Sequence, residues 1–477
     1  MTSIPVDLIF DILSRLPEKS IARFLCVSKL WGSIVCGPYF TEMFLTRSLA
    51  RPRLLFVVVR CDEWSFFSSP HPQNPYGKSS LVVAADFQMK LSKGVSRHSC
   101  SYANGLIYFP SMWISKEEYD EEVRMICNPS TGQYVILPKL LRRYGLLEFV
   151  SMIKSCNIIY VIVSMASTII QEQKHQHGQA GNFLGFDPVD KQFKVFSMSY
   201  AYDDHHILTL GTGKMSWRKI QCALTHNRCG EGVCFNGVVF YLAKKADDGS
   251  YVIVCFDIRS EKFMFIEAKH FCDTSNAHLI NYKGKLGGIS LKYACDGGFP
   301  LELSMWVLED VEKHEWSKYV YTLRAENKVV KVKNNLSVVG TTARGEIVLS
   351  KNKSNIIIDT IKPFYVFYFN PEKNTLLSVE IQDFGERHEW FMGHKVYAFV
   401  DHVEDLKFNI MKTTFAATSI SPPEQKRKAT STSTSSIENH QMRTVAHLQK
   451  DRRTFESVNI FDVLCISDDD GSTGVKT

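Results

Sequence analysis

The chain has 477 residues, enough for a small module together with one large domain or two medium ones. Its formal net charge of +6 is small for this length and spreads thinly, so the sequence does not predict a nucleic-acid-binding protein. The 13 cysteines include no Cys-x-x-Cys pair, acidic residues interrupt the apolar stretch at the start, and no run of 18 apolar residues occurs. These features predict free thiols in a reducing compartment (nucleus, cytoplasm or both), with no signal peptide and no membrane span.

The first 48 residues have helical periodicity. Pro5 suits the first turn of a helix, because the backbone N–H that proline lacks would have no acceptor there. Asp7 places a negative charge near the positive end of the helix dipole. One apolar stripe predicts a helix that ends at Pro17; it consists of Leu8, Ile9, Ile12, Leu13 and Leu16. Shorter helical segments are predicted near residues 21–25, 30–35 and 38–48. A bundle this small buries little by itself, so we expect another domain or another protein to cover its surplus apolar surface.

This module resembles an F-box. The resemblance rests on three groups of residues: Ile4, Pro5, Asp7 and Leu8; Ile12, Leu13, Leu16 and Pro17; and Cys26, Val27, Ser28, Lys29 and Trp31. It implies binding to a Skp-type adaptor and, through the adaptor, to a cullin–RING ubiquitin ligase. The contact positions that the resemblance implies are Ile4, Pro5, Leu8, Ile12, Leu16, Val27 and Trp31. Without the resemblance, the same pattern also fits a helical cap on a larger core.

In residues 51–410, short apolar runs alternate with turn signals, which predicts a mainly antiparallel β domain. A first strand is predicted at residues 54–59 and a buried, β-branched strand at residues 157–163. Asn104-Gly105 and Asn236-Gly237 each separate two apolar runs, which predicts a hairpin because both residue types accept a positive φ. Related turns are predicted at Gly284 and Gly345.

A strand–turn–strand unit recurs in this domain, with Asn or Asp opening the turn. Units begin near residues 128, 187, 257, 309 and 370, at spacings of 59, 70, 52 and 61 residues. One four-stranded sheet per unit predicts a distorted β-propeller of five or six blades. A pair of two-sheet sandwiches is the alternative.

The β domain also resembles the plant F-box-associated domain, a C-terminal interaction domain. The matching stretches are residues 100–109, 182–188, 284–288, 306–310 and 363–370. The resemblance implies a plant source and recruitment of a protein substrate. Residues 413–477 follow; their polar, Ser/Thr-rich composition predicts a mostly disordered tail.

The search for catalytic and metal-binding motifs predicts neither a catalytic site nor a cofactor or metal. His175 and His177, together with His205 and His206, could suggest a metal site, but a solvated loop is the simpler interpretation. Cys229 and Cys234 lie five residues apart beside His226, without a second pair to complete a zinc set. No Gly-x-Ser-x-Gly elbow or Walker loop is present, and residues 211–213 are interpreted as a hairpin turn.

Four aromatic residues interrupt the strand alternation and fit either interface anchors or core filling: Trp64, Phe66, Phe67 and Trp113. In the tail, Lys426-Arg427-Lys428 fits a minimal nuclear signal. Val463, Leu464 and Ile466, followed by three aspartates, resemble a SUMO-interacting motif that would give weak SUMO contact. A last strand on the β domain, or a fortuitous apolar patch, is the alternative for that stretch.

The sequence thus predicts a non-catalytic substrate-recognition subunit of a Skp–cullin–F-box ubiquitin ligase. Its substrate is not specified by any motif. Two other functions remain open at this point: an F-box scaffold that acts outside the ligase, and a propeller enzyme with a helical cap.

Overall fold

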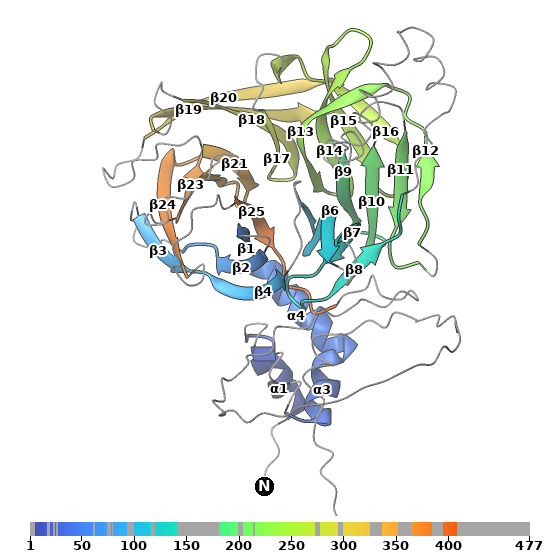
Figure 1. Cartoon of the computed structure of the whole chain (residues 1–477). Coiled ribbons are helices and arrows are strands. Elements are labelled where there is room, and N and C mark those ends of the chain that lie inside the picture. The colour runs from blue at the N-terminus through green and yellow to red at the C-terminus, as the bar shows by residue number, and fades with distance from the viewer. Residues whose placement is uncertain are drawn as a thin grey trace, which may run out of the picture.

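The computed structural model describes residues 5–16, 20–21, 24, 27–60, 63–73, 78, 80–92, 100–115, 120–140, 181–198, 204–212, 215–271, 277–293, 299–324, 336–351, 364–383 and 395–407. A helical module precedes a ring of six mainly antiparallel sheets (Figure 1). No helix within these ranges is long and apolar enough to cross a membrane. The predicted strand at residues 157–163 and the tail, including Lys426–Lys428 and Val463, Leu464 and Ile466, lie outside the described residues.

The helical module contains α1 (Val6–Leu13), α3 (Lys29–Cys36) and α4 (Pro38–Ala50). Helix α1 follows Pro5 as predicted, but its last helical residue is Leu13, earlier than the stop expected at Pro17. Ser28 caps α3, because its Oγ accepts a hydrogen bond from the backbone N–H of Trp31 at 3.3 Å. Pro38 opens α4, where its missing N–H costs no helical hydrogen bond. The predicted segment at residues 21–25 falls largely outside the described residues.

Six sheets form the ring, and we number these blades in chain order. The first blade contains β25 (Lys395–His402), β1 (Arg53–Arg60), β2 (Glu63–Pro70) and β4 (Asp86–Ser92). The second contains β5 (Ser101–Ala103), β6 (Leu106–Ser115), β7 (Asp120–Cys127) and β8 (Tyr134–Leu137). The third contains β9 (Asn182–Asp187), β10 (Gln192–Met198), β11 (His205–Thr209) and β12 (Arg218–Ile220).

The other three blades continue around the ring. The fourth contains β13 (His226–Phe235), β14 (Val238–Lys245), β15 (Tyr251–Asp257) and β16 (Phe263–Glu267), followed by a 3-10 turn at Lys269–Phe271. The fifth contains β17 (His278–Tyr282), β18 (Lys285–Tyr293), β19 (Leu301–Asp310) and β20 (Glu315–Leu323). The sixth contains β21 (Leu336–Thr341), β22 (Ile347–Lys351), β23 (Phe364–Asn370), β24 (Thr375–Gln382) and β3 (Ser80–Ala84). The prediction of a β-propeller is confirmed, with six blades, and the sandwich alternative is wrong.

The two Asn-Gly hairpins form as predicted. Asn104 and Gly105 have φ values of 42° and 88° between β5 and β6, and Asn236 and Gly237 have 51° and 77° between β13 and β14. Positive φ at both central residues defines the hairpin turn whose twist matches that of the flanking strands.

The recurring Asx turns also form, but they do not mark the same place in every blade. The turns that begin at Asn128, Asp257, Asp310 and Asn370 join the third and fourth strands of their blades. The turn at Asp187 instead joins β9 to β10, the first two strands of the third blade. This difference contributes to the uneven spacing of the repeat.

Two strand pairs close the ring. β25, from the end of the described chain, pairs antiparallel with β1 in the first blade. β3, from the start of the β domain, pairs in parallel with β24 at the edge of the sixth blade. The first and last blades are therefore joined by strands from both ends of the domain.

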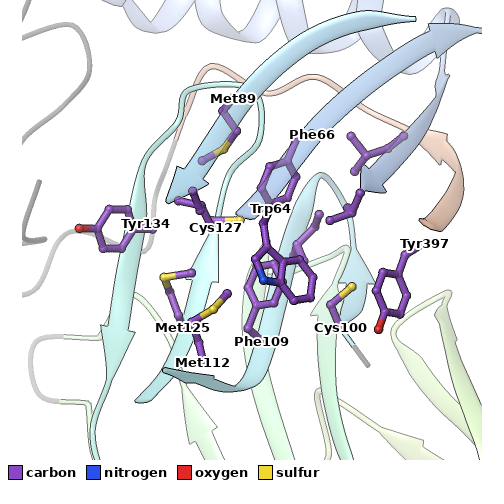
Figure 2. Packing of buried hydrophobic residues seen from close by; sticks show 14 of the residues in the cluster. Trp64, Phe66, Met89, Cys100, Phe109, Met112, Met125, Cys127, Tyr134 and Tyr397 are labelled. Atoms are coloured by element: carbon purple, nitrogen blue, oxygen red, sulfur yellow. The ribbon is translucent and has the colours of Figure 1, made fainter. Parts of the chain in front are cut away.

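The blades pack through apolar side chains, and Figure 2 shows the cluster between the first and second blades. Trp64 is fully buried there, 4.9 Å from Phe109 in an edge-on arrangement and 6.0 Å from the stacked ring of Tyr397. Phe66 and Phe67 are also buried, at 0% and 3% exposed, so these aromatic residues fill the core and are not interface anchors. Trp113 on β6 is half-buried.

Candidate adaptor surface and propeller channel

The predicted adaptor-contact residues fall into two groups in the structure. Leu8 and Ile12 are each 54% exposed and Val27 is 62% exposed, although all three are large and apolar. Pro5 is exposed as well, whereas Leu16 and Trp31 are half-buried and pack against the core of the module. Ile4 lies outside the described residues. The first group can contact a partner without any change in the module.

Leu30 is a further exposed apolar residue of the module that was not among the predicted contact positions. Leu30 on α3 is 68% exposed, and it lies three residues after Val27. On α1, Leu8 and Ile12 are four residues apart and so lie one above the other on one face. Leu30 could have been found in the sequence as the apolar residue between Lys29 and Trp31, within the motif that carries the F-box resemblance.

Beneath these residues, the module has its own small core and a charged clamp. Helix α4 contributes Phe40 and Phe44 to the core, at 0% and 3% exposed. Arg47 of α4 donates a hydrogen bond to the backbone oxygen of Asp11 at 2.7 Å and also pairs with the Asp11 carboxylate. The Arg47 side chain holds the pKa of Asp11 below its ordinary value, with a further contribution from Arg15, 2.9 Å away. This clamp fixes α1 on α4.

Helix α4 connects the module directly to the propeller, and Figure 1 shows it between the sheets and the helices α1 and α3. The backbone N–H of Glu404, just after β25, donates to Ser48 Oγ of α4 at 2.7 Å. Leu406 packs against the core of the module, and Asn128 of the second blade donates to the backbone oxygen of Asp405 at 2.8 Å. Both ends of the propeller therefore hold the module in one orientation.

Ionisable groups are buried at this junction. His402 on β25 is 1% exposed, and its Nδ1 lies 3.3 Å from the hydroxyl oxygen of Tyr102. Burial, with the charge of Arg53, lowers the pKa of His402 to about 3, so the ring is neutral at pH 7. Burial also raises the pKa of Glu404, whose Oε1 is 3.4 Å from Arg53 Nε.

A cavity of about 450 Å³ runs along the inner strands of the six blades, β25, β5, β9, β13, β17 and β21. Its volume is in the usual range for small-molecule sites. Its described lining includes the charged residues Arg228, Glu231 and Asp401 and the histidine His278. Arg228 lies over the ring of Phe183 at 5.3 Å, and its burial lowers the pKa of its guanidinium group. Such a lining can hold a ligand through charge, hydrogen bonds and apolar contact.

The histidines and cysteines considered as metal ligands in the sequence have other neighbours in the structure. His175 and His177 lie outside the described residues, and His206 lies beside Asp204 with Nδ1 and Oδ2 3.6 Å apart. Cys229 and Cys234 pack into different apolar clusters, as expected of thiols that do not complete a zinc set. His226 instead lies near His205 and Cys222, a cysteine that the sequence analysis did not consider.

Together, the helical module and the ring define an F-box joined to a propeller, and comparison with known families agrees. The description "F-box associated beta propeller domain" matches residues 53–403, and "F-box domain" matches residues 1–43. The chain belongs to the plant F-box proteins that carry an F-box-associated β-propeller.

Relatives from Arabidopsis thaliana match over nearly the whole chain. F-box protein At1g67130 is 50% identical over 98% of this chain and 93% of its own length. F-box protein At3g57590 is 48% identical, covering 86% of this chain and 92% of its own length. Among solved structures, the β-propeller domain of the Trilobed protease from Pyrococcus furiosus covers 59% of this chain and 70% of that chain, at 10% identity and a TM-score of 0.30, a weak likeness.

Proposed function

We propose that this protein is the substrate-recognition subunit of a Skp–cullin–F-box ubiquitin ligase. The F-box binds a Skp-type adaptor, and the propeller holds a protein substrate near the ubiquitin-loaded enzyme of the complex. The chain contributes position, because a substrate held close to the reacting group is ubiquitinated faster without any catalytic side chain here.

The observation that carries this proposal is the exposed apolar surface of the F-box. Leu8, Ile12 and Val27 are each more than half exposed in a module whose own core is already complete. An exposed large apolar residue costs solvation free energy that burial against a partner recovers, at about 25 cal/mol per Å². The family membership of the chain supports a Skp-type adaptor as that partner.

The propeller is suited to the second role because of the way it is attached. The strand ends that meet the F-box lie at one face of the ring, where Asn128 contacts Asp405. Because neighbouring strands run antiparallel, the end of β6 and the start of β7 lie at the opposite face. A substrate bound at that face would lie at the far end of the ring from the adaptor.

The first experiment is a pull-down with a Skp-type adaptor. We expect Leu8→Ala/Ile12→Ala to weaken adaptor binding at least about tenfold, since truncating buried interface anchors typically costs 1 kcal/mol or more each. Val189→Ala is the matched control, because Val189 is 69% exposed in the third blade, outside the F-box. Absence of binding by the unmodified chain would disprove the proposal.

A second measurement separates the ligase subunit from an F-box scaffold. Co-purification of the cullin with the intact chain, and its loss with Leu8→Ala/Ile12→Ala, is expected of a ligase subunit. Adaptor binding without the cullin would identify the scaffold instead.

A further inference from the structure

Three side chains that can ligate a metal come together between the third and fourth blades. His205 begins β11, Cys222 lies between β12 and β13, and His226 begins β13. Their ligand atoms all lie within 4.8 Å of one another. His205 and His226 are 1% and 5% exposed, and Cys222 is half-buried. These two imidazoles and the thiol lie between two sheets that otherwise pack through apolar side chains.

The backbone fixes the protonation of one of the histidines. His226 Nδ1 is 2.7 Å from the carbonyl oxygen of Leu224. A carbonyl can only accept, so Nδ1 carries the proton and Nε2 keeps its lone pair. Histidines that bind metals usually donate their other ring N–H in this way, which orients the ligand nitrogen. Cys222 Sγ is 3.4 Å from the same carbonyl oxygen, so one peptide group holds two of the three side chains.

Aromatic rings hold the other histidine. The His205 ring stacks on Phe196 and meets Phe263 edge-on, each at a centroid distance of 5.6 Å. The rings of His205 and His226 are themselves 5.6 Å apart. Two imidazolium ions this close in a buried space would repel each other strongly, whereas two neutral imidazoles at this distance can both turn a lone pair towards one metal ion.

We propose that His205, Cys222 and His226 bind a zinc ion. Neutral imidazole nitrogen and cysteine thiolate are the ligands that Zn²⁺ takes in proteins, and three such ligands with a water give a tetrahedral site. Ligand atoms in such a site are about 3.3–3.7 Å apart, from the usual bond lengths. From separations of up to 4.8 Å, the three side chains therefore draw together by about 1.5 Å at most, and Cys222 lies on a connection between strands that can adjust.

The surroundings can accommodate the ion. The Tyr241 hydroxyl is 2.8 Å from His226 Nε2, close enough to form its hydrogen bond with a zinc-bound water instead. Arg228 lies near Tyr241, and its positive charge is offset by Glu231. The zinc would join β11 of the third blade to β13 of the fourth.

The test is the metal content of the full chain, purified without chelator and dialysed after exposure to zinc. We expect about one zinc per chain in the unmodified protein and in the control His206→Gln, which changes the neighbour of His205. Cys222→Ser should lose the zinc; the serine is close in shape, so folding is retained. Zinc well below one per chain in the unmodified protein, or full zinc content in Cys222→Ser, would overturn the proposal.

Cobalt provides a second readout that a purely structural role of these residues would not give. Bound Co²⁺ should show a thiolate-to-cobalt charge-transfer band that is absent in Cys222→Ser and retained in Cys229→Ser. A chelator should also lower the melting temperature of the unmodified chain and leave that of Cys222→Ser unchanged. A band that persists in Cys222→Ser would contradict the assignment, and this result does not depend on whether the F-box binds an adaptor.

Discussion

The F-box and the propeller use large apolar residues in opposite ways. In the propeller, Trp64, Phe66 and Phe109 are fully buried between blades. In the F-box, Leu8 and Ile12 are more than half exposed on α1. The propeller completes its core from its own sheets, whereas the F-box leaves part of its apolar surface exposed. Apolar character alone therefore does not separate core from interface in this chain, and burial decides between them.

The largest effect should come from the propeller core. Trp64→Ala removes a fully buried indole from between two blades and should lower the free energy of unfolding by about 3–5 kcal/mol. Urea unfolding of the full chain measures it. Trp113→Ala is the matched control, since Trp113 is only half-buried, and it should cost clearly less. Equal losses for the two variants would contradict the distinction between them.

Helix α1 carries one buried and one exposed leucine, so the contributions of core and surface can be compared within a single helix. Leu13 is 2% exposed and Leu8 is 54% exposed on α1. Leu13→Ala should destabilise the F-box by about 2–4 kcal/mol, while Leu8→Ala should change its stability by about 0.5 kcal/mol or less. Hydrogen exchange of α1 and α4 reports the stability, and adaptor titration reports the binding. Tight adaptor binding by a well-folded Leu8→Ala variant would show that this surface is not the interface.

The junction between the two regions should be sensitive to pH through His402. Its pKa is about 3 in the folded protein, against about 6.5 for an unfolded histidine. The neutral His402 ring makes its full contribution to the free energy of unfolding above pH 6.5. This contribution is lost as the pH falls towards 3, because the unfolded chain then binds a proton at His402 that the folded chain does not. The slope is about 1.4 kcal/mol per pH unit, or about 2 kcal/mol between pH 6.5 and 5.

Unfolding at several pH values tests this prediction. His402→Gln keeps a polar side chain but removes the titration, so its stability should fall less steeply below pH 6.5. The groups nearest to the ring, Tyr102 and Arg53, are unchanged in this comparison. Identical slopes for the two proteins would show that His402 is not the group responsible.

The smallest expected effect concerns the attachment of the F-box. Ser48→Ala removes the acceptor of the Glu404 N–H and should cost about 1 kcal/mol, the usual net value of one hydrogen bond. Ser33→Ala is the control, because Ser33 Oγ hydrogen-bonds within its own helix, to Leu30. Limited proteolysis near residue 51 should accelerate in Ser48→Ala and not in Ser33→Ala. Equal rates would show that the junction is held by other contacts.

Local patterns predicted the elements well, and tertiary contacts explain most of the errors. Asn104-Gly105 and Asn236-Gly237 formed the expected hairpins because their conformational requirement is local. The blade count was left open at five or six, because the five recurring turns lie in the second to the sixth blade, and the first blade is completed by β25 from far along the chain. No complete zinc set around His226 was visible in the sequence, because a sequence pattern can group only residues that are close along the chain. His205 and Cys222 are 17 residues apart, and only the fold brings them together.

The double closure of the ring has a consequence for synthesis of the protein on the ribosome. The first blade needs β25, whose residues emerge after all the other strands, and the sixth blade waits for β24 before β3 can pair with it. Until β25 is synthesised, the edge of β1 that it covers is unpaired, and the backbone N–H and C=O groups of β1 can form hydrogen bonds with a strand of another chain. A chain interrupted before Lys395 would leave that edge exposed and would also lack the Glu404 and Leu406 contacts that hold the F-box. Truncated products should therefore be prone to aggregate and be poor at presenting a correctly oriented F-box.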